Sequence, residues 1–144
     1  MDSYKSNEEI VNYNIETIFD KLSDFENFSK IKEMGNIPPE LKSKIDSVEF
    51  TSDSISFKAD PVGMIKLVIE ERTRPSKLVL SAATFPIPFK AVINLEKIDE
   101  TSTRLMTEFQ IELNIMLRAM ASKPLSDGAI KFGQMLASLP YDRF

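Results

Sequence analysis

The side chains able to donate or accept a proton in a reaction are of few types in this chain. Its 144 residues include no histidine and no cysteine. Within this chain, that composition excludes a Ser-His-Asp triad, a Cys-His pair and the zinc motifs that use these residues. An acid–base reaction would depend on Tyr4, Tyr13, Thr107, Arg118 or a buried carboxylate, and the sequence places no two of them together.

The carboxylates are numerous, but their spacing is typical of a solvated surface. Glu70, Glu96, Glu108 and Glu112 occupy alternate positions of predicted strands, on the face opposite the apolar residues. They do not form the pair that acid and base catalysis by carboxylates requires. No stretch has the ligand spacing of a calcium loop. We therefore expect no metal ion and no cofactor.

A second group of residues has types that suit an apolar binding cavity. Met116 and Met120 lie one helical turn apart, and their flexible thioethers could repack around varied ligands, although methionines facing a sheet are also ordinary core. Gly128 either leaves room for a ligand or lets a helix approach the sheet closely, and close approach is the commoner reason. Thr107 is the plainest polar side chain on an inward strand face. Arg118 could meet a ligand carboxylate, but a surface arginine is the commoner role.

Several of these candidates lie on a long amphipathic helix that the periodicity predicts at residues 114–139. Pro140 ends the apolar pattern, because proline has no N–H with which to continue a helix. Pro124 lies inside the helix and is expected to curve it around the sheet, with a break into two helices as the alternative. The apolar stripe comprises Leu117, Ala121, Leu125, Gly128, Phe132, Met135, Leu136 and Leu139.

The roughly seventy residues before this helix alternate with a period of two, which predicts strands. Each strand is apolar on one face and polar on the other, as in an antiparallel sheet with one solvated side. An edge strand is expected at residues 3–12, followed by two short helices that meet near Ser23. Asn14 is the expected cap of the first helix, and Ser23 with Glu26 has the form of a capping box for the second. The six later strands are expected at residues 45–50, 55–59, 65–70, 78–82, 89–96 and 105–113.

The composition argues against several classes of partner. A net charge of −4 and a pI near 5.0, without any basic run, disfavour a nucleic-acid binder, which needs clustered Lys and Arg. The sequence has no signal-like apolar segment at its start and no run of roughly 18 apolar residues. We therefore expect a cytoplasmic protein without stable membrane insertion. Residues 1–144 fit a single domain, because no linker or repeat divides them.

The predicted element order, β-α-α-β6-α, resembles the helix-grip fold of the START-like superfamily, also called SRPBCC. Residues 18–25 (IFDKLSDF) look like that family's first helix and its exit, and residues 88–95 (PFKAVINL) look like its penultimate strand. Residues 123–128 (KPLSDG) and 136–141 (LASLPY) are similar to the final helix of small, uncharacterised bacterial members related to polyketide cyclases and lipid-transfer domains. The resemblance implies an α+β fold, with a curved antiparallel sheet of about seven strands wrapped around the C-terminal helix.

The resemblance also implies a cavity between the sheet and this helix. We therefore expect the chain to bind a small hydrophobic or amphipathic molecule there, such as a lipid, a quinone or an aromatic polyketide-like compound. A cyclase or dehydratase, which the family permits, and a protein-interaction module without a ligand are the alternatives. The predicted cavity lining comprises Leu67, Phe89, Ile93, Thr107, Phe109, Met116, Met120 and Gly128.

Overall fold

A computed structural model describes residues 2–33, 39, 43, 48–59, 63–82 and 88–142 of the chain. The helices in these ranges are α1 (Ile15–Leu22), α2 (Glu26–Glu33) and α4 (Ile115–Ala137). The strands are β1 (Asp2–Lys5), β2 (Glu9–Val11), β3 (Glu49–Phe50), β4 (Ser54–Ala59), β5 (Gly63–Thr73), β6 (Lys77–Ala82), β7 (Phe89–Asp99) and β8 (Ser102–Ile111). The fold class is α+β, as predicted.

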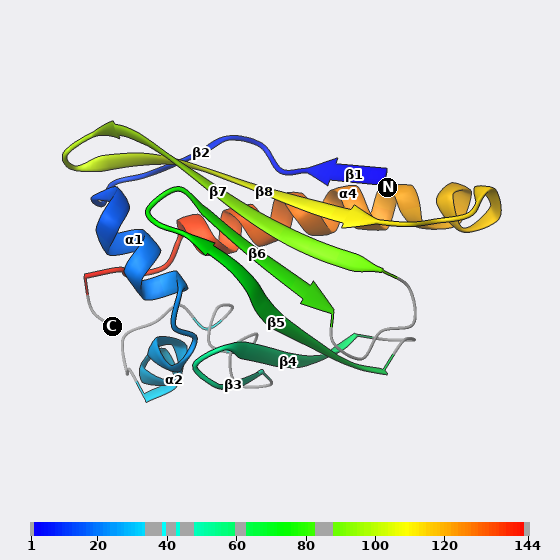
Figure 1. Cartoon of the computed structure of the whole chain (residues 1–144), viewed down its shortest axis with the longest axis horizontal. Helices are drawn as coiled ribbons and strands as arrows, with labels where there is room; N and C mark the ends of the chain where they lie inside the picture. The colour runs from blue at the N-terminus through cyan, green and yellow to red at the C-terminus, as the bar shows by residue number, and fades with distance from the viewer. Residues whose placement is uncertain are drawn as a thin grey trace.

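The strands form one curved antiparallel sheet with the order β1-β8-β7-β6-β5-β4-β3, and β2 also pairs with β8. Figure 1 shows α4 running along the β1–β8 side of this sheet, with α1 and α2 at one end of it. This arrangement confirms the predicted helix-grip fold. The predicted strand at residues 45–50 is described only as Glu49–Phe50, and residues 45–47 lie outside the described part of the chain.

The predicted edge strand at residues 3–12 is two strands, which accounts for the eighth strand of the sheet. β1 and β2 both pair with β8 and are separated by residues 6–8. At the interruption, the Ser6 hydroxyl accepts a hydrogen bond from the Thr107 N–H at 2.8 Å, and the Ser6 N–H donates to the Thr107 carbonyl at 2.8 Å. A side-chain oxygen here takes the place of a backbone carbonyl, so the polar groups of β8 stay satisfied across the break.

The two short helices form where predicted, but the cap between them is one residue later. The Asn14 side chain accepts from the Glu16 N–H at 3.0 Å and caps α1, as expected. The predicted capping box at Ser23 is wrong, because the Ser23 N–H bonds to the Phe19 carbonyl and ends α1. The Asp24 carboxylate instead accepts from the Glu26 N–H at 3.0 Å at the start of α2.

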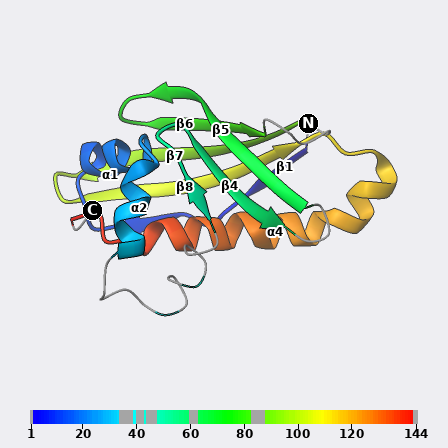
Figure 2. The same ribbon diagram turned by 90° about the horizontal axis from the view of Figure 1, so that it is seen from below.

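The final helix, α4, is continuous across Pro124, so the alternative of two separate helices is wrong. It begins after Asn114, whose side chain accepts from the Leu117 N–H at 2.8 Å. Figure 2 shows the first turns bending away from the direction of the remaining turns. Of the predicted apolar stripe, Leu136 and Leu139 are buried, whereas Leu117 is 38% exposed. The buried face of α4 also includes Ala129 and Gly133, which lie next to the predicted stripe and not on it.

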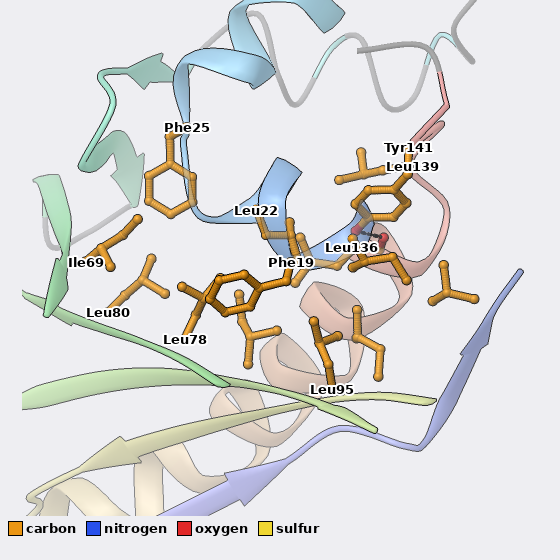
Figure 3. Close-up of a cluster of buried hydrophobic side chains, with 14 of the residues drawn as sticks. Phe19, Leu22, Phe25, Ile69, Leu78, Leu80, Leu95, Leu136, Leu139 and Tyr141 are labelled. Carbon is orange, nitrogen blue, oxygen red and sulfur yellow. Dashed lines mark hydrogen bonds between the residues drawn. The ribbon is translucent and has the colours of Figure 1, made fainter. Parts of the chain in front are cut away.

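The main core lies between the inner face of the sheet, α1 and the end of α4 (Figure 3). Tyr141, just beyond α4, is fully buried and donates its hydroxyl to the Leu136 carbonyl at 2.6 Å. Burial raises the pKa of the Tyr141 hydroxyl, because the charged phenolate cannot be solvated there. The core residues labelled in the figure are Phe19, Leu22, Phe25, Ile69, Leu78, Leu80, Leu95, Leu136, Leu139 and Tyr141.

None of the described helices is apolar enough over a sufficient length to cross a membrane.

Candidate functional site

An apolar cavity of about 80 Å³ lies between the two short helices, the second half of α4 and the inner face of the sheet. The described lining is contributed by α1, α2, β3, β4, β6, β7, α4 and the segments next to them. Every described lining residue is apolar, and four of them are phenylalanines. They are Leu22, Phe25, Phe28, Val48, Phe50, Ile55, Leu80, Ile93, Phe132, Met135, Leu136 and Leu139.

Aromatic rings form much of the wall on the side of α2 and β3. Phe28 and Phe50 are stacked, with ring centroids 5.3 Å apart and an interplanar angle of 18°. Phe25 packs against Phe28 at 5.8 Å with a tilt of 52°. Figure 3 shows Phe25 and Leu22 pointing from the helical side toward Leu80 on the sheet.

Polar contacts outside the cavity hold this aromatic wall in place. The Phe25 N–H donates to the Ser52 carbonyl at 3.2 Å, which ties the start of α2 to the turn between β3 and β4. Arg72, on β5, donates to the Ser23 carbonyl at 3.1 Å and to the Asp53 carboxylate at 2.7 Å, so it joins the same two segments. The Arg72–Asp53 ion pair is solvent-exposed and contributes little to stability by itself.

A second arginine fixes α1 from outside. Arg74 makes two hydrogen bonds to the Asp20 carboxylate, at 3.0 and 3.1 Å. These bonds raise the pKa of the Arg74 guanidinium above its ordinary value. Arg72 and Arg74 therefore connect the end of β5 to the helical side of the cavity.

Close contact between helix and sheet occurs at Gly133 of α4. A Cβ added to Gly133 would lie 2.9 Å from Ser6 Cβ and 3.0 Å from Ser6 Oγ. One turn earlier, the Thr107 hydroxyl donates to the Ala129 carbonyl at 2.8 Å. These contacts fix the second half of α4 over the break between β1 and β2, and thereby position Phe132, Met135 and Leu136 at the cavity.

The predicted lining residues lie in four places. Ile93 lines the cavity, and Leu67 is buried in the core on β5. Phe109 contacts both Phe89, at 5.4 Å between ring centroids, and Phe132, at 5.8 Å. These residues form a layer beside the cavity that also contains Thr107 and Gly128, where an added Cβ would lie 3.4 Å from Phe109 Cε2. Met116 and Met120 lie on the projecting start of α4 and are 74% and 73% exposed.

Other lining residues were not singled out from sequence, although some carried a signal. Phe25 and Phe28 are three residues apart in a predicted helix, which placed them on one covered face. Phe132, Met135, Leu136 and Leu139 form the densest part of the predicted stripe. The contribution of Phe50 had no local signal, because it depends on the folding of β3 against α2.

The candidates for proton transfer are engaged elsewhere. The Tyr4 hydroxyl lies 3.3 Å from Ser122 Oγ, and the Tyr13 hydroxyl donates to the Asp142 carboxylate at 3.0 Å. Arg118 donates to the Asp2 carboxylate at 2.8 Å. The described cavity lining contains no tyrosine and no ionisable side chain. Within the described ranges, no cluster of acidic residues is arranged to hold a metal ion.

A larger hollow of about 510 Å³ lies on the outer face of the sheet, away from this cavity. Its charged side chains belong to β5, β6, β7 and β8, and they carry both signs. Lys90 pairs with Glu70 at 3.2 Å, and Gln110 donates to the Glu108 carboxylate. Because this hollow is lined by polar and charged side chains of both signs on the solvated face of the sheet, whereas the described lining of the smaller cavity is apolar, we regard the smaller cavity as the candidate site.

No protein-family model and no curated protein sequence matches the chain. Solved structures match it over nearly its whole length. A protein from Thermobifida fusca, solved by NMR, is 16% identical with a TM-score of 0.62, over 99% of this chain and 95% of that one.

Two further structures indicate the type of fold. Norcoclaurine synthase from Thalictrum flavum, solved in complex with dopamine and hydroxybenzaldehyde, is 9% identical with a TM-score of 0.72, over 99% of this chain and 88% of that one. A START superfamily protein from Mycobacterium smegmatis is 11% identical with a TM-score of 0.53, over 93% of this chain and 98% of that one. At these identities the similarity establishes the fold and transfers no activity.

Proposed function

We propose that this chain, which has the START-like helix-grip fold, binds a small hydrophobic molecule in the apolar cavity. The observation that supports this most directly is a lining of apolar side chains drawn from both short helices, four strands and α4. Burial of an apolar ligand against such a wall gains about 25 cal/mol per Å² of surface removed from water. In this proposal residues 1–144 act as one binding domain.

The fold supports this proposal at a general level. Norcoclaurine synthase, a structural neighbour, was solved with two small aromatic compounds bound. The described cavity differs from typical ligand pockets in its size, because about 80 Å³ is well below roughly 300–1,000 Å³. Met135 is half-buried, unbranched and part of the lining, so we infer that a change of its rotamer enlarges the space.

A cyclase or dehydratase would need a positioned proton donor or acceptor beside the ligand. The described lining offers neither, and Tyr4, Tyr13, Thr107 and Arg118 make their hydrogen bonds elsewhere. The geometry therefore favours binding over a reaction.

One observation favours a second function, which is contact with another macromolecular surface. Ile115, Met116, Leu117 and Met120 are exposed together on the first two turns of α4. Single exposed apolar residues are common, but a contiguous patch of this kind is typical of interaction sites. Sedimentation velocity at increasing protein concentration, with Met116→Ser/Met120→Ser as the comparison, tests for self-association through this patch.

The binding proposal is tested by thermal-shift screening with fatty acids, isoprenoid quinones and small aromatic compounds. We expect at least one class to raise the melting temperature in a concentration-dependent way, because ligand binding to the folded state stabilises it. Ile55→Phe introduces a larger side chain at the cavity wall and should remove this shift.

Ile98→Phe is the matched control, because it makes the same change at a β7 side chain that is 43% exposed and does not line the described cavity. This variant should keep the ligand response. Equal responses of the two variants would place binding outside the cavity, and the absence of any response in the wild-type protein would contradict the proposal.

A further inference from the structure

The chemistry of the lining restricts the ligand class further. We propose that the cavity selects uncharged single-ring aromatic molecules and rejects their carboxylate counterparts. This inference rests on the proposed binding function. It follows from three properties of the described wall, which are its lack of hydrogen-bond donors, its aromatic side and its size.

The first property is the absence of an available donor for an anionic group. The twelve described lining side chains carry no N–H or O–H group. Buried hydroxyls elsewhere in the described core are already used, since Thr107 donates to the Ala129 carbonyl and Tyr141 donates to the Leu136 carbonyl. A carboxylate in this cavity would lose its hydration and gain no hydrogen bond from the described lining side chains, so its binding is strongly disfavoured.

Two arginines near the helical side of the cavity do not change this conclusion. Arg72 is engaged by Asp53 and the Ser23 carbonyl, and Arg74 is engaged by both oxygens of Asp20. Both arginines are substantially exposed and direct their guanidinium groups to these outer partners. A ligand carboxylate would have to displace an existing carboxylate before either arginine could neutralise it.

The second property is the aromatic side of the wall. Phe25, Phe28 and Phe50 form a continuous series of ring contacts, at 5.8 Å and 5.3 Å between successive centroids. Phe132 faces the same space from α4. Aromatic rings gain stabilisation from offset stacking and edge-to-face contacts beyond simple burial. A flat ring therefore gains more here than a saturated ring of the same carbon skeleton.

The third property is the size of the cavity. Its volume of about 80 Å³ is smaller than the roughly 150 Å³ of an engineered apolar cavity that binds benzene. One ring can be accommodated when Met135 repacks, whereas a long acyl chain or a fused polyketide requires much larger movements. The wall therefore favours the smallest members of the ligand classes expected from sequence.

The test compares toluene, benzoate, methylcyclohexane and decanoate with the wild-type protein at pH 7, by NMR titration of methyl resonances. We expect saturable binding of toluene at least tenfold tighter than that of benzoate or decanoate, and several-fold tighter than that of methylcyclohexane. The shifts should map to Ile55, Ile93 and Met135, and Ile55→Phe should abolish them.

Each other result overturns a specific step. If benzoate or decanoate binds as tightly as toluene, and this binding is lost in Ile55→Phe, the charge selectivity is overturned while the proposed binding function is upheld. Methylcyclohexane bound as tightly as toluene would overturn the aromatic preference. If none of the four compounds binds, the binding function and this inference both fail.

A pair of methionine variants tests the size argument independently. Met135→Ala removes a side chain from the wall, and Met120→Ala removes the same atoms from an exposed position on the same helix. Naphthalene should bind Met135→Ala at least fivefold more tightly than wild type, while Met120→Ala should leave its affinity unchanged. Equal naphthalene affinity in wild type and Met135→Ala would overturn the limit to one ring.

Discussion

Apolar side chains on the first two turns of α4 are exposed to solvent, whereas apolar side chains on its last three turns are buried or half-buried. Ile115 is 83% exposed, whereas Leu136 is 3% exposed and Ala129 is completely buried. Figures 1 and 2 show the first turns extending past the ends of β1 and β8, so these strands do not cover them. A helical apolar period thus identifies the residues that share a face, but the length of the neighbouring strands decides which part of that face is buried.

The two halves also differ in how closely the backbone can approach the sheet. In the second half, Ala129 and Gly133 present almost no side chain to Ser6 and Thr107. The first half reaches β1 through longer side chains, since Tyr4 contacts Ser122 and Asp2 pairs with Arg118. Small residues therefore fix the half that forms the cavity wall, while polar side-chain contacts to β1 hold the first half.

The largest expected effect comes from the same truncation made in each half. Leu136→Ala should destabilise the protein by about 3 kcal/mol, because it removes buried atoms from the core and leaves a cavity. Leu117→Ala should cost less than about 1 kcal/mol, because Leu117 is 38% exposed. Urea unfolding followed by circular dichroism measures both. Similar losses would mean that the start of α4 is covered in solution.

A smaller loss is expected where the helix backbone approaches the sheet. Gly133→Ala should destabilise the protein by about 2 kcal/mol, because the new Cβ would overlap Ser6 Cβ at 2.9 Å. In a Ser6→Gly background the same change should cost much less, since the overlapping atoms are gone. A double-mutant cycle measures this coupling, and strictly additive losses would show that Ser6 is not the obstacle.

The anchor at the end of α4 should produce a pH-dependent effect. Tyr141→Phe removes the hydrogen bond to the Leu136 carbonyl and should cost about 1 kcal/mol at neutral pH. Because burial raises the pKa of Tyr141 above its ordinary value of 10.0, its contribution is complete below pH 10 and is lost as the pH rises further.

The wild-type protein should therefore lose stability above pH 10 more steeply than Tyr141→Phe does. Urea unfolding at several pH values from 8 to about 11.5 measures this difference in slope. Parallel curves for the two proteins would show that the Tyr141 hydroxyl ionises as readily in the folded state as in the unfolded state.

The fold could be predicted because its signals are local. Alternation over β7 and β8 and the helical period over α4 are each contained in a single stretch of sequence. The errors occurred where two local signals competed or a tertiary contact decided. Ser23 and Asp24 are both good caps, and the extension of α1 by one hydrogen bond selected Asp24. The break at Ser6 depends on Thr107, about a hundred residues away.

The candidate cavity was less predictable for the same reason. Sequence places Phe132, Met135 and Leu136 on one covered face, but only folding brings Phe50 onto Phe28 and Arg72 onto Ser23 and Asp53. Met116 and Met120, at the start of α4, have the residue type and the helical spacing that a cavity wall would require. Their exposure follows from where the sheet ends, which no single segment encodes.

The smallest expected effect concerns Gly128, which lies between the two halves of α4. An alanine there gains about 1 kcal/mol of helix propensity relative to glycine. Its Cβ would lie 3.4 Å from Phe109 Cε2, so this half-buried ring must move by a few tenths of an ångström at most. We therefore expect Gly128→Ala to stabilise the protein by about 0.5 kcal/mol in urea unfolding, opposite in sign to Gly133→Ala. A loss of more than about 1 kcal/mol would show that overpacking outweighs helix propensity and that the closely packed half begins one turn earlier.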